Sequence, residues 1–192
     1  MALNGSLLNS LRKGGFIFYA RHGEATVGED LPYLNFQDCL TQRNLSEKGR
    51  WQAIYYGEIL RYLQIPIQSL VSASPFCRTI ETAQLAFGDG NVQVNPFWFD
   101  IYRLSENVTS NDRQIILNHF KSVLEATPVV EGKNKVIIAH GFPEGVGLGE
   151  IPYMGTVIIK PKGVGNGYEV VQRLSLEDWS KLVHSPYCPH YY

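Results

Sequence analysis

Two histidines and two arginines in this 192-residue sequence stand at positions from which their side chains can act together on a phosphoryl group. Arg21 and His22 directly follow one short apolar run, and His140 directly follows another. A guanidinium binds phosphate oxygens, and a neighbouring imidazole can attack phosphorus as a nucleophile. We therefore expect His22 to be catalytic; the alternative is that these are solvated polar residues at strand ends.

The two apolar runs predict buried strands. Residues 16–20 are β-branched and aromatic and follow Gly14-Gly15, and residues 135–139 form the clearest strand pattern in the chain. Ligands of open α/β sheets bind at the carboxyl ends of the strands. If these two strands are neighbours, His22 and His140 meet at one edge of the sheet.

A second arginine, Arg78, follows a predicted junction between a strand at residues 69–73 and a helix. Ser74 suits the N-cap and Pro75 the first helical position, so we expect a helix from there to Gly88. Arg78 then lies in or just after the first turn, where free amide N–H groups and the helix dipole favour an anion. We expect Arg78 to bind phosphate; the alternative is a surface arginine.

These four side chains are unsuited to a metal ion. No cysteine or carboxylate cluster accompanies them, and guanidinium groups repel a cation. They suit a phosphoryl group, which His22 would attack. The donors that bind the substrate and neutralise its charge would be Arg21, Arg78 and His140. We therefore expect no metal and no cofactor.

Strand and helix patterns alternate along the chain, which predicts one α/β domain over residues 1–192. We expect a mainly parallel central sheet flanked by helices, with an antiparallel extension from a hairpin at residues 156–160 and 168–174. The other expected helices cover residues 6–13 and 47–63, a stretch from about 110 to before Pro128, and residues 175–183.

Three local expectations complete this outline. Residues 92–99 are predicted to be extended. The aromatic residues of the second helix are assigned to the core, namely Trp51, Tyr55, Tyr56 and Tyr62. Residues 26–44 are too many for a plain connection and are typical of a lid or a binding loop.

Composition limits the partners. Apolar residues make up 44% and charged residues 18%, and the net charge of −1 favours neither nucleic acid nor a membrane. The expected partner is a small phosphorylated substrate or phosphate. No apolar run approaches the ~18 residues of a membrane span, so we expect a cytoplasmic protein. Three widely spaced cysteines form no metal pattern, and a disulfide framework is not expected.

Four short motifs follow one another between residues 16 and 141. They are Arg21-His22-Gly23-Glu24, a helix start at residues 45–53, the segment 74–83, and Ala139-His140-Gly141. In this order they resemble the motifs of the histidine phosphatase superfamily, which has the phosphoglycerate-mutase-like fold. The resemblance implies that His22 is phosphorylated and then dephosphorylated. It also implies that no metal is needed and that the phosphoryl group is bound by Arg21, Arg78 and His140.

These motifs do not identify the acid that protonates the leaving group. Mutases and many phosphatases of the superfamily carry a glutamate and a G-x-W-E-G-like stretch after the second arginine segment, and residues 95–104 here lack that stretch. Asp100 is the nearest carboxylate, and its apolar neighbours suit a proton donor. A capping or loop role is the alternative for Asp100. Glu24, Glu81 and Glu144 are weaker candidates, and a structural role is the alternative for Glu81, which lies on a predicted helix.

We therefore expect a phosphatase that hydrolyses phosphate monoesters or a related substrate through a phosphohistidine on His22. A mutase would use the same histidine, but the missing mutase-like segments count against it. A non-catalytic protein that binds a phosphorylated ligand is the other alternative. The intact His22 argues against it, because binding alone needs no nucleophile.

Overall fold

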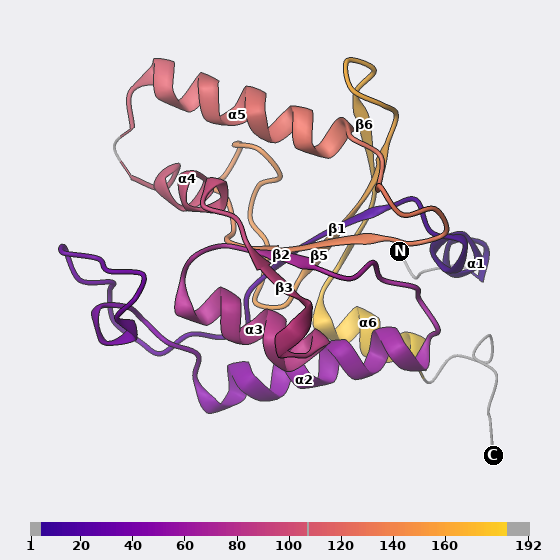
Figure 1. Ribbon diagram of the computed structural model, residues 1–192, viewed down its shortest axis with the longest axis horizontal. Helices are drawn as coiled ribbons and strands as arrows, with labels where there is room; N and C mark the ends of the chain where they lie inside the picture. Colours follow the sequence, from indigo (N-terminus) through magenta and orange to yellow (C-terminus); the bar gives the residue numbers. More distant parts are fainter. Residues whose placement is uncertain (1–4, 107, 184–192) are drawn as a thin grey trace.

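The computed structural model describes residues 5–106 and 108–183, and their strands form one sheet (Figure 1). The strand order is β3-β2-β4-β1-β5-β6. The strands are β1 (Ile17–Arg21), β2 (Val71–Ala73), β3 (Val92–Val94), β4 (Lys135–Ala139), β5 (Thr156–Pro161) and β6 (Tyr168–Leu174). The pairs among β3, β2, β4 and β1 are parallel, and β5 and β6 add antiparallel strands. The predicted α/β fold with a mainly parallel sheet is confirmed.

Helices cover both faces of this sheet, which gives three layers (Figure 1). The helices are α1 (Gly5–Lys13), α2 (Glu47–Tyr62), α3 (Cys77–Phe87), α4 (Phe97–Arg103), α5 (Ser110–Glu125) and α6 (Leu176–Val183). One face of the sheet is covered by α1, α2, α3 and α6, and the opposite face by α4 and α5. Two short 3₁₀ helices, η1 (Cys39–Thr41) and η2 (Asp89–Asn91), lie in connections.

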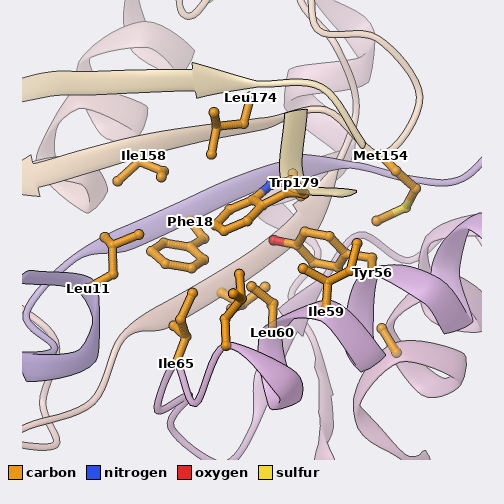
Figure 2. Packing of buried hydrophobic residues seen from close by; sticks show 14 of the residues in the cluster. Leu11, Phe18, Tyr56, Ile59, Leu60, Ile65, Met154, Ile158, Leu174 and Trp179 are labelled. Carbon is orange, nitrogen blue, oxygen red and sulfur yellow. The ribbon is translucent and has the colours of Figure 1, made fainter. Parts of the chain in front are cut away.

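The strand β1 shows why both faces need cover. Successive side chains of a strand point to opposite faces. Phe18 therefore packs in one buried cluster and Tyr19 in the other. Figure 2 shows Phe18 beside Trp179 of α6 and near Tyr56 of α2, and the ring centroids of Phe18 and Trp179 are 6.0 Å apart. Each such buried side chain contributes about 1.5–3 kcal/mol, so β1 is held firmly at the centre of the domain.

Parallel pairing of β1 with β4 aligns the two histidine motifs. Arg21 is the register partner of Ala139. The residues that follow the two strands are therefore adjacent, and the backbone N–H of His22 donates to the carbonyl of Ala139 at 3.0 Å. The neighbouring strands that the sequence hypothesis required are present.

Two predictions about local structure were wrong. Residues 97–99 are helical rather than extended, because β3 ends at Val94 and α4 begins at Phe97. The helix after β2 begins at Cys77 with Phe76 as its N-cap, so Ser74 does not cap it. Ser74 is instead buried with its hydroxyl toward a histidine of the site, as described below.

The assignment of all four α2 aromatics to the core was also wrong. Tyr56 is buried, but Trp51, Tyr55 and Tyr62 are 65%, 37% and 45% exposed. Only one stripe of a helix faces the sheet, and the buried face of α2 is formed by Ala53, Tyr56, Gly57 and Leu60 among others.

The expectation about the cysteines was wrong as well. Cys39 and Cys77 form a disulfide across 38 residues of sequence. It joins η1, in the loop between β1 and α2, to the first residue of α3. Spacing along the chain does not reveal this pair, because only the fold brings the loop over α3.

Candidate active site

The four residues singled out from the sequence lie together at the carboxyl edge of the parallel strands. They line a cavity of about 750 Å³. His22 follows β1, His140 follows β4 and Arg78 is the second residue of α3. All three are buried, with side chains that reach the cavity wall. Arg21, the last residue of β1, also lines the cavity.

The orientation of the His22 ring identifies its reactive atom. Nδ1 lies 2.7 Å from the carbonyl oxygen of Gly23. A carbonyl only accepts hydrogen bonds, so Nδ1 carries the proton and Nε2 of the neutral ring holds the lone pair. The Nε–H of Arg78 donates toward this Nε2 at 3.3 Å. Nε2 is therefore the atom from which attack can start.

Both histidines are held in the neutral form. Burial lowers the pKa of His22 well below its usual range, and the positive charges of Arg78 and Arg21 lower it further. Burial likewise lowers the pKa of His140, with added repulsion from His22 and Arg78. The lone pair on His22 is thus available at neutral pH, which a nucleophile requires.

His140 is positioned by a residue that the sequence had placed at a helix cap. The Ser74 hydroxyl lies 2.9 Å from Nε2 of His140. Tyr19 donates from its hydroxyl to the His140 carbonyl at 2.8 Å, which fixes the backbone. The His22 and His140 ring centroids are 5.5 Å apart, so both rings can face one ligand.

Arg21 retains a donor for an anion. Its Nη1 donates to the Ile151 carbonyl at 2.9 Å, and its guanidinium lies 4.1 Å from the centroid of the Tyr153 ring. Its Nε is buried and has no hydrogen-bond partner among the described residues. A buried donor without a partner is costly, and a ligand oxygen would satisfy it.

Two glycines of the motifs are required by a close approach. A Cβ on Gly23 would overlap the carbonyl group of Gly49, and one on Gly49 would overlap the backbone of Glu24. These glycines let the first turn of α2 contact the chain directly after His22. These two glycines therefore allow α2 to pack against the end of β1.

The structure adds residues that sequence reasoning missed. Arg43 lines the cavity, and Asp30 binds Arg78 through both carboxylate oxygens. Both belong to the loop at residues 26–44. The length of this loop was the only feature of the sequence that indicated a role in binding. Tyr102 of α4 also lines the cavity and donates to Asp30 at 3.0 Å.

The candidate acids named from the sequence, Asp100, Glu24, Glu81 and Glu144, do not line the cavity. The carboxylate of Asp100 accepts from Arg103 at 3.3 Å, and the Asp100 side chain is 37% exposed. Glu24 pairs with Lys48 at 2.8 Å. The carboxylate on the cavity wall is Glu150, which no sequence pattern had indicated.

Comparison with known proteins identifies the fold. No family model and no curated protein matches the sequence. A solved structure from Escherichia coli, assigned as an alpha-ribazole-5'-P phosphatase, matches with a TM-score of 0.59 and 16% identity over 85% of this chain and 98% of that chain. The chain has the histidine phosphatase fold.

Two further structures with the histidine phosphatase fold match over 85% of this chain and 98% of their own. The phosphoserine phosphatase of Entamoeba histolytica, solved with phosphoserine, has a TM-score of 0.54 and 15% identity. The protein histidine phosphatase SixA, complexed with tungstate, has a TM-score of 0.52 and 14% identity. The fold implied by the sequence motifs is confirmed.

Proposed function

We propose that this protein is a metal-independent phosphatase that hydrolyses phosphate monoesters or a related phosphorylated substrate through a phosphohistidine on His22. The observation that carries the proposal is the neutral His22 ring, whose Nε2 lone pair lies beside the Arg78 guanidinium. The solved structures of similar fold, which are phosphatases, support the same activity.

In the first step, Nε2 of His22 attacks phosphorus. The new N–P bond forms as the bond from phosphorus to the ester oxygen breaks, and the electron pair leaves with that oxygen, which takes up a proton. Charge on the phosphoryl oxygens is neutralised by donors that are already in place, among them Nε of Arg21 and Nε of Arg78. We also assign His140, which lines the cavity, to binding these oxygens.

In the second step, water attacks the phosphohistidine. The oxygen–phosphorus bond forms, the N–P bond breaks and its electron pair returns to Nε2 of His22. The water gives up a proton to the carboxylate that protonated the ester oxygen in the first step, and inorganic phosphate leaves the cavity. The ring is then neutral again with its proton on Nδ1, because the Gly23 carbonyl holds that tautomer throughout.

The charges on the cavity wall match a phosphate monoester. Such a group carries about −1.5 to −2 at pH 7. In the described ranges, Arg78 is ion-paired with Asp30, whereas Arg21 and Arg43 pair with no carboxylate. Arg21 and Arg43 are therefore available to bind the phosphate oxygens, and we assign Arg43 to substrate binding.

The first experiment is an assay with p-nitrophenyl phosphate before and after dialysis against EDTA. We expect turnover at the same rate in both samples, because the described part of the chain holds no group of three His, Cys, Asp or Glu side chains suited to a metal. A loss restored by Mg²⁺ or Zn²⁺ would reject metal independence. No turnover would indicate a phosphate-binding protein, and interconversion of phosphoglycerates would indicate a mutase.

The leaving-group acid is tested with a matched pair of variants, Glu150→Gln and Asp100→Asn. We propose Glu150, since it lines the cavity and Asp100 does not. An alkoxide needs a proton, whereas p-nitrophenol leaves readily as an anion. Glu150→Gln should therefore lower the rate on an alkyl phosphate by about 10²-fold and that on p-nitrophenyl phosphate much less.

Asp100→Asn should leave both rates near those of the unmodified protein. The opposite pattern would return the role to Asp100, as the sequence suggested. Equal losses on both esters would assign Glu150 a different role, such as holding the bound substrate.

The cytoplasmic location stays a prediction. No helix within the described segments is long and apolar enough to cross a membrane. The Cys39–Cys77 disulfide weighs against the cytoplasm, since thiols are kept reduced there.

A further inference from the structure

Arg78 is held by a buried carboxylate that belongs to no motif. Asp30 Oδ1 accepts from Nη1 at 2.7 Å and Oδ2 accepts from Nη2 at 3.0 Å. The side chains of Arg78 and Asp30 are 3% and 7% exposed. A buried bidentate pair of this kind fixes the plane of the guanidinium, and the Phe76 ring, whose centroid lies 4.2 Å from Cζ, packs against it.

The contact uses only one edge of the guanidinium. The end-on edge, formed by Nη1 and Nη2, is occupied by Asp30, and Nη1 also donates to the Arg43 carbonyl at 3.1 Å. Asp30 does not use the side edge, which is formed by Nε and the second N–H of Nη2. This Nε points to Nε2 of His22 at 3.3 Å, the atom that would carry the phosphoryl group.

Two further hydrogen bonds hold the carboxylate of Asp30 in place. It accepts from the backbone N–H of Arg43 at 2.8 Å and from the Tyr102 hydroxyl at 3.0 Å. Burial alone would raise the pKa of Asp30, but the hydrogen bonds from Arg78 and Arg43 outweigh burial and hold that pKa below its usual value. Asp30 is therefore an anion that cannot serve as the proton donor.

We propose that Asp30 is a positioning residue, which holds Arg78 by its end-on edge so that its side edge faces the phosphoryl group on Nε2 of His22. The inference concerns the site of the proposed phosphatase and rests on that function. It assigns the loop at residues 26–44 a part in phosphate recognition through Arg78, in addition to Arg43 on the cavity wall.

The direction in which phosphate binding changes when Asp30 is removed distinguishes the positioning role from simple charge repulsion. A carboxylate close to a phosphate site repels the anion, so removing it should by itself strengthen phosphate binding. If Asp30 acts through Arg78, removing it should instead weaken binding, since the guanidinium loses its orientation.

The experiment measures binding of inorganic phosphate by titration calorimetry, which needs no turnover. Asp30→Asn and Asp30→Ala should each weaken binding by about 10- to 100-fold, the size expected when a hydrogen bond to a charged group is lost. Arg78→Ala should weaken it as well. The double variant Asp30→Asn/Arg78→Ala should bind no more weakly than Arg78→Ala alone, because Asp30 then has nothing to position.

Asp38→Asn is the matched control. Asp38 lies in the same loop, where its carboxylate accepts from the Leu40 N–H at 3.0 Å and caps η1, so phosphate binding should be unchanged. Unchanged or tighter binding by the Asp30 variants would overturn the proposal, as would additive losses in the double variant. Failure of both Asp30 variants to fold, seen in thermal unfolding, would assign Asp30 to folding alone and also overturn it.

Measuring turnover and phosphate binding separately distinguishes the phosphatase hypothesis from the positioning role of Asp30. A protein without turnover, in which the Asp30 variants still bind phosphate more weakly, would reject the phosphatase and retain the positioning role. Phosphatase turnover together with normal phosphate binding by the Asp30 variants would retain the phosphatase and reject the positioning role.

Discussion

Replacing His22 by alanine should abolish turnover of phosphate esters, with a loss of about 10⁴-fold or more, the size seen when a nucleophile is removed from a covalent mechanism. The reason is that Nε2 of His22 is the cavity atom whose lone pair the structure fixes, through the hydrogen bond between Nδ1 and the Gly23 carbonyl. The measurement is kcat/KM on p-nitrophenyl phosphate at pH 7, where the lowered pKa keeps this ring neutral.

Mass analysis of the rapidly quenched protein provides the second readout. The unmodified protein should carry an acid-labile phosphoryl adduct on the peptide with His22, and His22→Ala should carry none. His119→Ala is the matched control, since His119 is an exposed residue of α5 that does not line the cavity. Near-native turnover by His22→Ala, or an adduct on His140 instead, would contradict the mechanism.

The double variant Cys39→Ser/Cys77→Ser should lower the free energy of unfolding by about 2–4 kcal/mol. The reason is that the unfolded chain gains conformational entropy when the disulfide no longer closes a long loop. The disulfide closes 38 residues of sequence, from the loop at residues 26–44 to the start of α3. For a domain of this size the loss corresponds to roughly 5–15 °C in Tm. Thermal and denaturant unfolding without reductant measure it.

Cys188→Ser is the control, because Cys188 takes no part in this disulfide. It should leave the Tm near that of the unmodified protein. Thiol titration of the unfolded protein without reductant should find one free thiol, since three cysteines minus the two in the disulfide leave one. Three free thiols would show that the bond does not form in the isolated protein.

The disulfide and the Asp30–Arg78 pair act on the same junction. Cys77 and Arg78 are the first two residues of α3, and each is tied to the loop that precedes α2. Phe36 of that loop also packs on Phe76, with ring centroids 5.2 Å apart. Covalent, ionic and apolar contacts thus hold the loop against Phe76, Cys77 and Arg78, the last of which belongs to the proposed phosphate site.

The sequence by itself determined the elements that end at the site. The strand that carries Arg21 and His22 and the strand that precedes His140 are short apolar runs ended by polar residues and glycine, and such signals act within a few residues. They sufficed to predict the sheet and the gathering of both imidazoles at its carboxyl edge. These local signals did not predict helix boundaries that depend on a single side chain. Ser74 is the example, since its hydroxyl lies toward His140 instead of capping α3.

Only the tertiary structure decided how the long loop contributes. Asp30 lies 48 residues before Arg78 in sequence, and Cys39 lies 38 residues before Cys77. No periodicity or local propensity encodes such pairs, because a loop with few backbone restraints takes its course from the surface on which it packs. The fold therefore decided which arginines line the cavity without a direct ion pair and which carboxylate binds Arg78. The proposed phosphate chemistry depends on these features.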